Sequence, residues 1–209
     1  MRNNNGRMVI FVTVLVAVTL LGSCQLLYDP FNQMTIDGSK YPLSRMYVYE
    51  HSDLEGVLTV VITSKGLNVG GSQGETFSGK GDFLAVTLAS ESGSLETGIY
   101  EFKAASPPAI VPLFSYAVVG FDADRDEVDE GYLVGGGSIV VRTIIGGGYS
   151  IHVELRGGTE EELNTDDPPE DWVWPTSTPI IATFRGHVTD TFTGPFFGSS
   201  GSRIGARNW

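Results

Sequence analysis

The chain has almost no cysteine, because Cys24 is the only one among its 209 residues. A disulfide framework, which many small exported domains use to support a small core, is therefore excluded. Basic side chains are also scarce, with 13 Lys and Arg against 25 Asp and Glu. Affinity for nucleic acids depends on clustered Lys and Arg that neutralise phosphates, and the sequence shows no such cluster. We therefore expect no nucleic acid among the partners of this protein.

Long hydrophobic runs are missing as well, apart from one near the N-terminus. Arg2 and Arg7 precede residues 8–21, which carry no charge and are rich in Val, Leu and Ile. The run is shorter than the roughly 17–25 residues of a membrane-spanning helix. A basic start and a short apolar run that ends in small residues are typical of a secretory signal. We expect residues 1–23 to be a signal peptide that is removed on export.

The end of this run, Leu21-Gly22-Ser23-Cys24, resembles the lipobox of bacterial lipoproteins. The resemblance implies cleavage before Cys24, whose thiolate then accepts a diacylglyceryl group. Further acylation, for example with palmitate, gives lasting membrane anchorage where one chain would be marginal. Gln25 follows the cysteine in place of the Asp that retains such proteins in the inner membrane. The expected location is the cell envelope, with the protein lipid-anchored at the periplasmic or the outer face of the outer membrane.

Helical periodicity is absent from the remainder of the chain. Apolar residues do not recur at helical spacing for more than one turn, and 27 Gly and 10 Pro favour turns. Short apolar runs separated by Gly, Ser and Asp predict strands instead. The predicted strands cover residues 45–50, 54–63, 83–89, 98–103, 115–121, 138–145, 149–156 and 178–188.

Two kinds of strand pattern occur. Residues 59–62 and 83–86 are almost continuously apolar, which is typical of central strands. Residues 149–156 alternate between apolar and polar, which indicates one buried and one solvated face. The glycines at 146–148 connect this strand to residues 138–145, and they favour a tight hairpin because glycine accepts positive φ.

Many short strands with polar turns predict an all-β domain. An antiparallel β-sandwich is favoured because the connections at 104–114 and 157–177 are long, as in Greek-key linkages between sheets. A calycin-like β-barrel is the alternative. We expect a single all-β domain over residues 44–209 after a flexible leader over 24–43, which contains several turn sequences.

The order of strand and turn motifs is similar to that of uncharacterised secreted lipoproteins of Bacteroidetes. The motifs run from Gly81-Asp82-Phe83-Leu84, through Tyr149-Ser150-Ile151-His152, to Ile181-Ala182-Thr183-Phe184. The resemblance covers residues 81–188 and implies an exported all-β lipoprotein. It implies no particular activity.

Two groups of side chains are candidates for metal binding. Asp122, Asp124 and Asp126 alternate, and Ca²⁺ takes six to eight oxygen ligands, so an irregular calcium site is one interpretation. The other is a solvated acidic turn between two strands. His152 and Glu154 share one face of a strand and form half of a zinc site, which needs three or four ligands. The alternative is that both side chains are simply exposed.

The most unusual segment is the acidic, proline-rich connection at 166–175, which contains Trp172 and Trp174. Exposed indole rings stack on sugar faces, and carboxylates accept hydrogen bonds from sugar hydroxyls. Binding residues also concentrate in loops that a rigid sheet supports. The two tryptophans are therefore our candidates for ligand binding, with a glycan or an envelope protein as partner. The alternative is that they cover the core.

Gly70-Gly71-Ser72-Gln73-Gly74 matches the nucleophile elbow of hydrolases, but no helical pattern follows it, so we expect a hairpin loop. No residue is assigned a catalytic role. We expect a non-enzymatic envelope lipoprotein, a binding or accessory module without a cofactor. The first alternative is a structural subunit of a pilus or adhesin, trimmed after Arg45 as in lipidated pilins of Bacteroidetes. A hydrolase is the second alternative.

Overall fold

The computed structural model describes residues 31–52, 54–103, 115–162 and 175–194. The chain divides into two units, Met1–Phe31 and Asn32–Trp209, and the following concerns the second. Within the described ranges the only helix is a single 3₁₀ turn, η1 (Glu160–Glu162). None of these residues forms a helix long and apolar enough to cross a membrane.

The regular structure consists almost entirely of β-strands. In chain order they are β1 (Gln33–Ile36), β2 (Ser39–Pro42), β3 (Arg45–His51), β4 (Val57–Thr63), β5 (Leu67–Gly70), β6 (Thr76–Ala89), β7 (Gly98–Lys103), β8 (Tyr116–Asp122), β9 (Glu130–Ile144), β10 (Gly148–Gly158), β11 (Thr178–Gly186) and β12 (Val188–Gly194). Every strand predicted from the sequence therefore overlaps an observed one.

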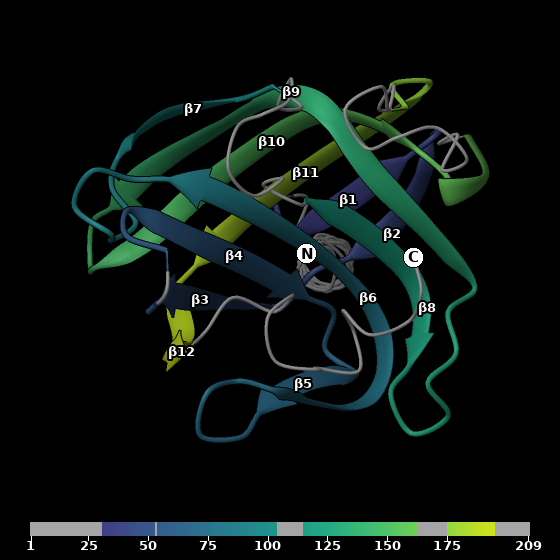
Figure 1. Cartoon of the computed structure of the whole chain (residues 1–209), viewed down its shortest axis with the longest axis horizontal. Coiled ribbons are helices and arrows are strands. Elements are labelled where there is room, and N and C mark those ends of the chain that lie inside the picture. The colour runs from purple at the N-terminus through teal and green to yellow at the C-terminus, as the bar shows by residue number, and fades with distance from the viewer. Residues whose placement is uncertain (1–30, 53, 104–114, 163–174, 195–209) are drawn as a thin grey trace, which may run out of the picture. The chain divides into compact units, whose positions relative to one another are not determined.

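The strands form one large, open, mixed sheet in the order β12-β3-β4-β6-β8-β9-β10-β11-β1-β2 (Figure 1). Outside this path, β5 pairs with β6 and β7 pairs with β9. The prediction of an all-β, sandwich-like fold is confirmed. The observed sheet differs from a purely antiparallel one at one pair of strands, because β12 runs parallel to β3.

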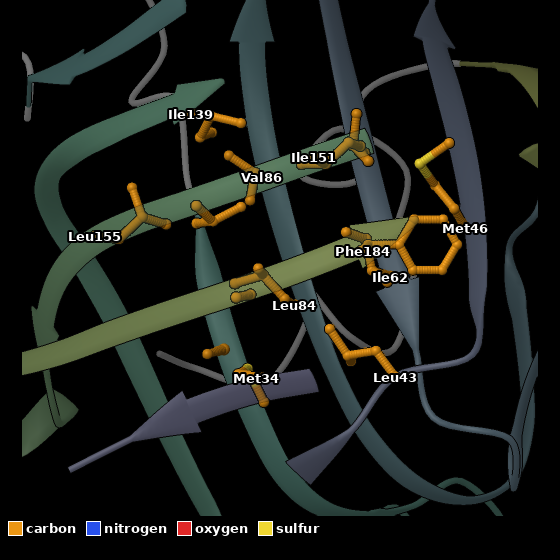
Figure 2. Packing of buried hydrophobic residues seen from close by; sticks show 14 of the residues in the cluster. Met34, Leu43, Met46, Ile62, Leu84, Val86, Ile139, Ile151, Leu155 and Phe184 are labelled. Carbon is orange, nitrogen blue, oxygen red and sulfur yellow. The ribbon is translucent and has the colours of Figure 1, made fainter. Parts of the chain in front are cut away.

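The main core lies between two halves of this sheet (Figure 2). The first half contributes side chains such as Met46, Ile62 and Leu84 from β3, β4 and β6. The second half contributes side chains from β1, β9, β10 and β11, among them Ile151 and Phe184. Burial of this apolar surface is the main force that holds the two halves together.

The first half is also buried on its other face. The apolar residues of β3, β4 and β6 that alternate with those of the main core belong to a second, mostly aromatic cluster. This cluster also takes in Phe121 of β8 and Phe192 of β12. Residues 59–62 and 83–86 thus lie in strands covered on both sides, which explains why their sequences are almost continuously apolar.

The second half is buried on one face only. Along β10 the burial alternates, with Ile151, Val153 and Leu155 buried and the residues between them exposed. The hairpin of β9 and β10 has the predicted glycine turn, in which Gly146 and Gly147 have φ of 99° and 86°. The strands of this half are β7, β10, β11, β1, β2 and the part of β9 from Gly136 to Ile144. We call their solvated side the outer face.

Several boundaries differ from the sequence-based prediction. Residues 33–42, which we placed in the leader, form the hairpin β1–β2, and β1 pairs with β11. The predicted strand at 178–188 ends at Gly186, and a separate strand, β12, begins at Val188 and pairs with β3. Strands β6 and β9 are longer than expected because each changes partners along its length.

Candidate functional site

Three of the residues singled out in the sequence lie outside the described residues. These are the expected lipidation site Cys24 and the candidate ligand-binding residues Trp172 and Trp174. The structure does describe both ends of the connection that carries the tryptophans.

The base of this connection is held by Glu162, the last residue of η1. The hydroxyl of Ser177, just before β11, donates a hydrogen bond of 2.6 Å to Glu162 Oε2, and the amide of Thr159 donates to Oε1 at 3.2 Å. These hydrogen bonds, that from Ser177 first, lower the pKa of Glu162. The described residues that flank this segment, Glu162 and Ser177, therefore lie side by side.

Two glycines let the returning chain lie directly on the sheet at this point. A Cβ atom on Gly135 would be 2.4 Å from the carbonyl oxygen of Pro175. One on Gly158 would be 2.6 Å from the Cβ of Pro175 and 2.8 Å from the carboxyl group of Glu162. All three distances are far below van der Waals contact, so this close approach requires glycine at these positions.

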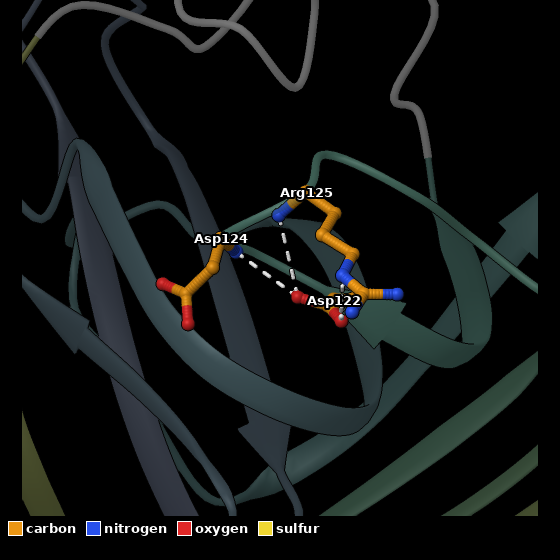
Figure 3. Close-up of polar contacts among 3 residues, drawn as sticks. All are labelled: Asp122, Asp124 and Arg125. Atoms are coloured by element: carbon orange, nitrogen blue, oxygen red, sulfur yellow. Dashed lines mark hydrogen bonds and ion pairs between the residues drawn. The ribbon is translucent and has the colours of Figure 1, made fainter.

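The acidic candidates lie at the end of β8 and in the turn that leads to β9, and Figure 3 shows two of them, Asp122 and Asp124. The carboxylate of Asp122 accepts hydrogen bonds from the amides of Asp124 and Arg125 at 3.2 and 3.3 Å, and it lies 3.8 Å from the Arg125 guanidinium. Asp126 adopts a positive φ of 56°. Among the described residues no three His, Cys, Asp or Glu form a group that could hold a metal ion, so Asp122, Asp124 and Asp126 are not such a group.

No third His, Cys, Asp or Glu of the described residues joins His152 and Glu154 in a group that could hold a metal ion. His152 Nε2 lies 2.9 Å from Glu154 Oε1, and both side chains are exposed on the outer face. His152 faces Thr183 across β10 and β11, whereas His187 lies four residues further along, in the break before β12. At about 3.3 Å per residue, the two histidines are roughly 13 Å apart.

Ser72, the serine of the elbow-like motif, lies in the hairpin loop between β5 and β6, as expected. The carboxylate of Glu75 closes this loop by accepting a hydrogen bond from the amide of Gln73 at 2.8 Å. Gly74 has a φ of 72°, and a Cβ there would collide with the rings of Tyr49 and Phe192. The loop is thus folded back onto the aromatic cluster.

Sequence reasoning missed a buried chain of polar side chains. His51 Nε2 lies 2.8 Å from Thr59 Oγ1, which lies 2.9 Å from Thr87 Oγ1, and the amide of Thr87 donates to Ser115 Oγ at 3.0 Å. All four residues are buried. The sequence did hint at this chain, because Thr59 and Thr87 each interrupt an apolar run. The two threonines face each other in the pairing of β4 with β6. Their mutual bonds offset the cost of burying polar groups.

Arg45, the trimming position of the pilus-like alternative, lies within a paired strand. It faces Thr63 in the β3–β4 register, and its guanidinium donates hydrogen bonds to the side chain of Asn68 and the carbonyl of Leu67. Met46 is completely buried. A cut after Arg45 would therefore separate β1 and β2 from the remaining strands.

The outer face combines positive charge with exposed apolar side chains. Ile99 of β7 is 71% exposed and lies beside Val140 of β9. Among the side chains that the structure describes, those with charge that point outward here are four basic ones and two acidic ones: Lys40, Arg142, Arg156 and Arg185, and Glu101 and Glu154. This balance is opposite to that of the whole chain, whose formal charge is −12.

The described residues thus show a hydrogen-bonded base on either side of residues 163–174, formed by Glu162 and Ser177, and a basic outer face. Both belong to the second half of the sheet, which is buried on one side only. No protein-family model matches the chain, and neither a curated protein nor a solved structure matches it.

Proposed function

We propose that this protein is a lipid-anchored lipoprotein of the cell envelope, attached through Cys24 to the outer membrane. Its β domain acts as a non-enzymatic binding module. The lipobox-like sequence before Cys24 supports the anchor, because the chain places its only cysteine where lipidation requires one. The observation that supports the binding role is the clamp between Glu162 and Ser177 at the base of residues 163–174.

The clamp supports binding because it lowers the cost of ordering a loop around a ligand. Association is penalised by the freedom that a binding segment loses, and fixing both ends of the segment reduces this penalty. The segment carries Trp172 and Trp174 among Asp and Glu side chains. Indole rings and carboxylates together suit the apolar faces and hydroxyl groups of a sugar. The proposed ligand class is therefore a glycan.

The chain contains three tryptophans, so its own fluorescence reports on this proposal. Titration with β-glucan, mannan and chitin oligosaccharides is expected to shift or quench the emission for at least one of them. Trp172→Phe with Trp174→Phe should remove this response, whereas Trp209→Phe, a matched change outside the connection, should preserve it. An equal response in both variants would contradict the assignment to Trp172 and Trp174.

The anchor is tested separately. Cells fed radiolabelled palmitate are expected to label the wild-type protein and not the Cys24→Ala variant. The variant should also move from the membrane fraction to the soluble fraction. A Cys24→Ala protein that stays membrane-bound would show that something other than a lipid on Cys24 holds it.

A further inference from the structure

The turn between β9 and β10 presents apolar side chains to solvent. Val140 and Ile144 point to the outer face along β9, and Ile145 follows at the tip, fully exposed. The amide of Gly147 donates to the carbonyl of Ile144 at 3.2 Å, which closes the turn. A Cβ built on Gly146 or Gly147 meets nothing within 4 Å, so the tip projects freely.

Two arginines lie immediately beside this tip. Arg142 faces Ser150 across β9 and β10, and Ser150 faces Arg185 across β10 and β11, so the three side chains form one row on the outer face. Both arginines are exposed. Within the described ranges, neither takes part in an ion pair. The row therefore presents positive charge that no carboxylate of these ranges neutralises.

The opposite end of β9 carries the reverse charge. The last residue of β8 and the turn that precedes β9 hold the carboxylates of Asp122, Asp124, Asp126, Glu127 and Asp129, with Arg125 as the one basic residue of residues 122–129. With about 3.3 Å per residue, the two turns are separated by roughly 45 Å measured along the path of β9. An anionic surface would therefore attract the arginine end and repel the acidic end, which fixes one orientation.

The chain also enters the domain next to the arginine row. The amide of Arg185 donates to Asn32 Oδ1 at 2.6 Å, and Asn32 Nδ2 donates to the carbonyl of Arg185 at 3.3 Å. Asn32 is eight positions after Cys24, and a fully extended chain of that length spans at most about 29 Å. A lipid on Cys24 would thus hold the membrane surface within reach of this end of the sheet.

We propose that the β9–β10 turn docks on a membrane that contains anionic phospholipids, with Ile144 and Ile145 entering the lipid interface and Arg142 and Arg185 contacting lipid phosphates. The inference rests on the proposed lipid anchor. Each basic side chain near an anionic membrane favours the docked state about fivefold. Burial of one isoleucine favours it by on the order of tenfold or more.

The test uses the lipidated chain, reconstituted into vesicles of phosphatidylcholine with or without phosphatidylglycerol. Ile145→Cys introduces a thiol for an environment-sensitive nitrobenzoxadiazole label at the tip. Asp124→Cys places the same label at the opposite end of β9. The label at residue 145 is expected to shift to the blue and brighten several-fold on the anionic vesicles, while the label at residue 124 stays water-like.

The charge dependence has a matched control. The double variant Arg142→Glu with Arg185→Glu should abolish the emission shift. The double variant Lys65→Glu with Lys80→Glu changes the net charge by the same amount at exposed positions outside the arginine row, and it should preserve the shift. Circular dichroism of both variants checks that the sheet is intact. A response that is the same in both pairs would overturn the role of the arginine row.

Flotation of the vesicles separates the two proposals. Protein that floats with a water-like label at residue 145 overturns the docking and leaves the anchor standing. Protein that does not float, or that carries the label on Cys24 as well, contradicts the anchor, and the docking inference fails with it. The inference is also overturned if the emission shift of the label at residue 145 is the same with and without phosphatidylglycerol and increases with the amount of protein per vesicle. Such a result indicates contact between two copies of the chain.

Discussion

The two halves of the sheet are built from the same kind of strand but differ in how many faces they bury. β3, β4 and β6 have apolar clusters on both sides, whereas β10 and β11 face the core on one side and solvent on the other. A strand covered on both sides has no free surface with which to bind a ligand. The Glu162–Ser177 pair and the basic outer face both belong to the one-sided half.

Aromatic contacts show how the extra face of the first half is stabilised. The ring of Phe83 lies 5.5 Å from Phe77 and 5.7 Å from both Tyr116 and Phe121, and Tyr49 lies 5.1 Å from Phe192. Aromatic pairs at such distances and tilted angles contribute beyond their buried area. Phe77 comes from the part of β6 that pairs with β5, so this hairpin covers the face.

The largest effect is expected when this two-sided burial is broken. Phe83 and Leu84 are neighbours in β6 that point to opposite clusters, and both are essentially buried. Phe83→Ala should lower the free energy of unfolding by about 4 kcal/mol and Leu84→Ala by about 3 kcal/mol, because each leaves a cavity. Urea unfolding of both variants measures this. A small cost at Phe83 alone would mean that the second cluster is not a true core.

A smaller loss of unfolding free energy is expected at high pH. Burial raises the pKa of Tyr116, in the aromatic cluster, from 10.0 to about 12. The unfolded chain therefore releases this proton first, so stability present below pH 10 is lost as the pH rises toward 12. Tyr116→Phe keeps the ring and should flatten the decline in unfolding free energy over this range. An unchanged decline would show that Tyr116 does not contribute to it.

Periodicity in the sequence predicted the strands and the burial of β10, because alternation of residue types follows directly from strand geometry. It did not predict β1 and β2. Their turn sequences, Asp37-Gly38 and Tyr41-Pro42, are typical of an irregular leader as well as of a hairpin. What makes these residues strands is the pairing of β1 with β11, about 150 residues away, which no local pattern reveals.

The sequence says less about candidate sites than about the fold, because a site depends on residues that only the folded chain brings together. The sequence drew attention to Asp122, Asp124 and Asp126, but metal binding depends on how side chains converge in space. The partner of Glu162 was not foreseeable, since Ser177 lies 15 residues away across a connection. The arginine row was also hidden, because Arg142 and Arg185 come together only through the register of β9, β10 and β11.

The smallest effect is expected on the outer face of β10. His152 and Glu154 form an exposed pair, and such pairs contribute little, so His152→Ala should change the unfolding free energy by less than about 0.5 kcal/mol. Its neighbour Val153 is buried in the main core, and Val153→Ala should cost on the order of 2 kcal/mol. Urea unfolding of the two variants compares the two faces of one strand directly. Equal costs would mean that the outer face is covered in the native protein, and the second half would then be as fully buried as the first.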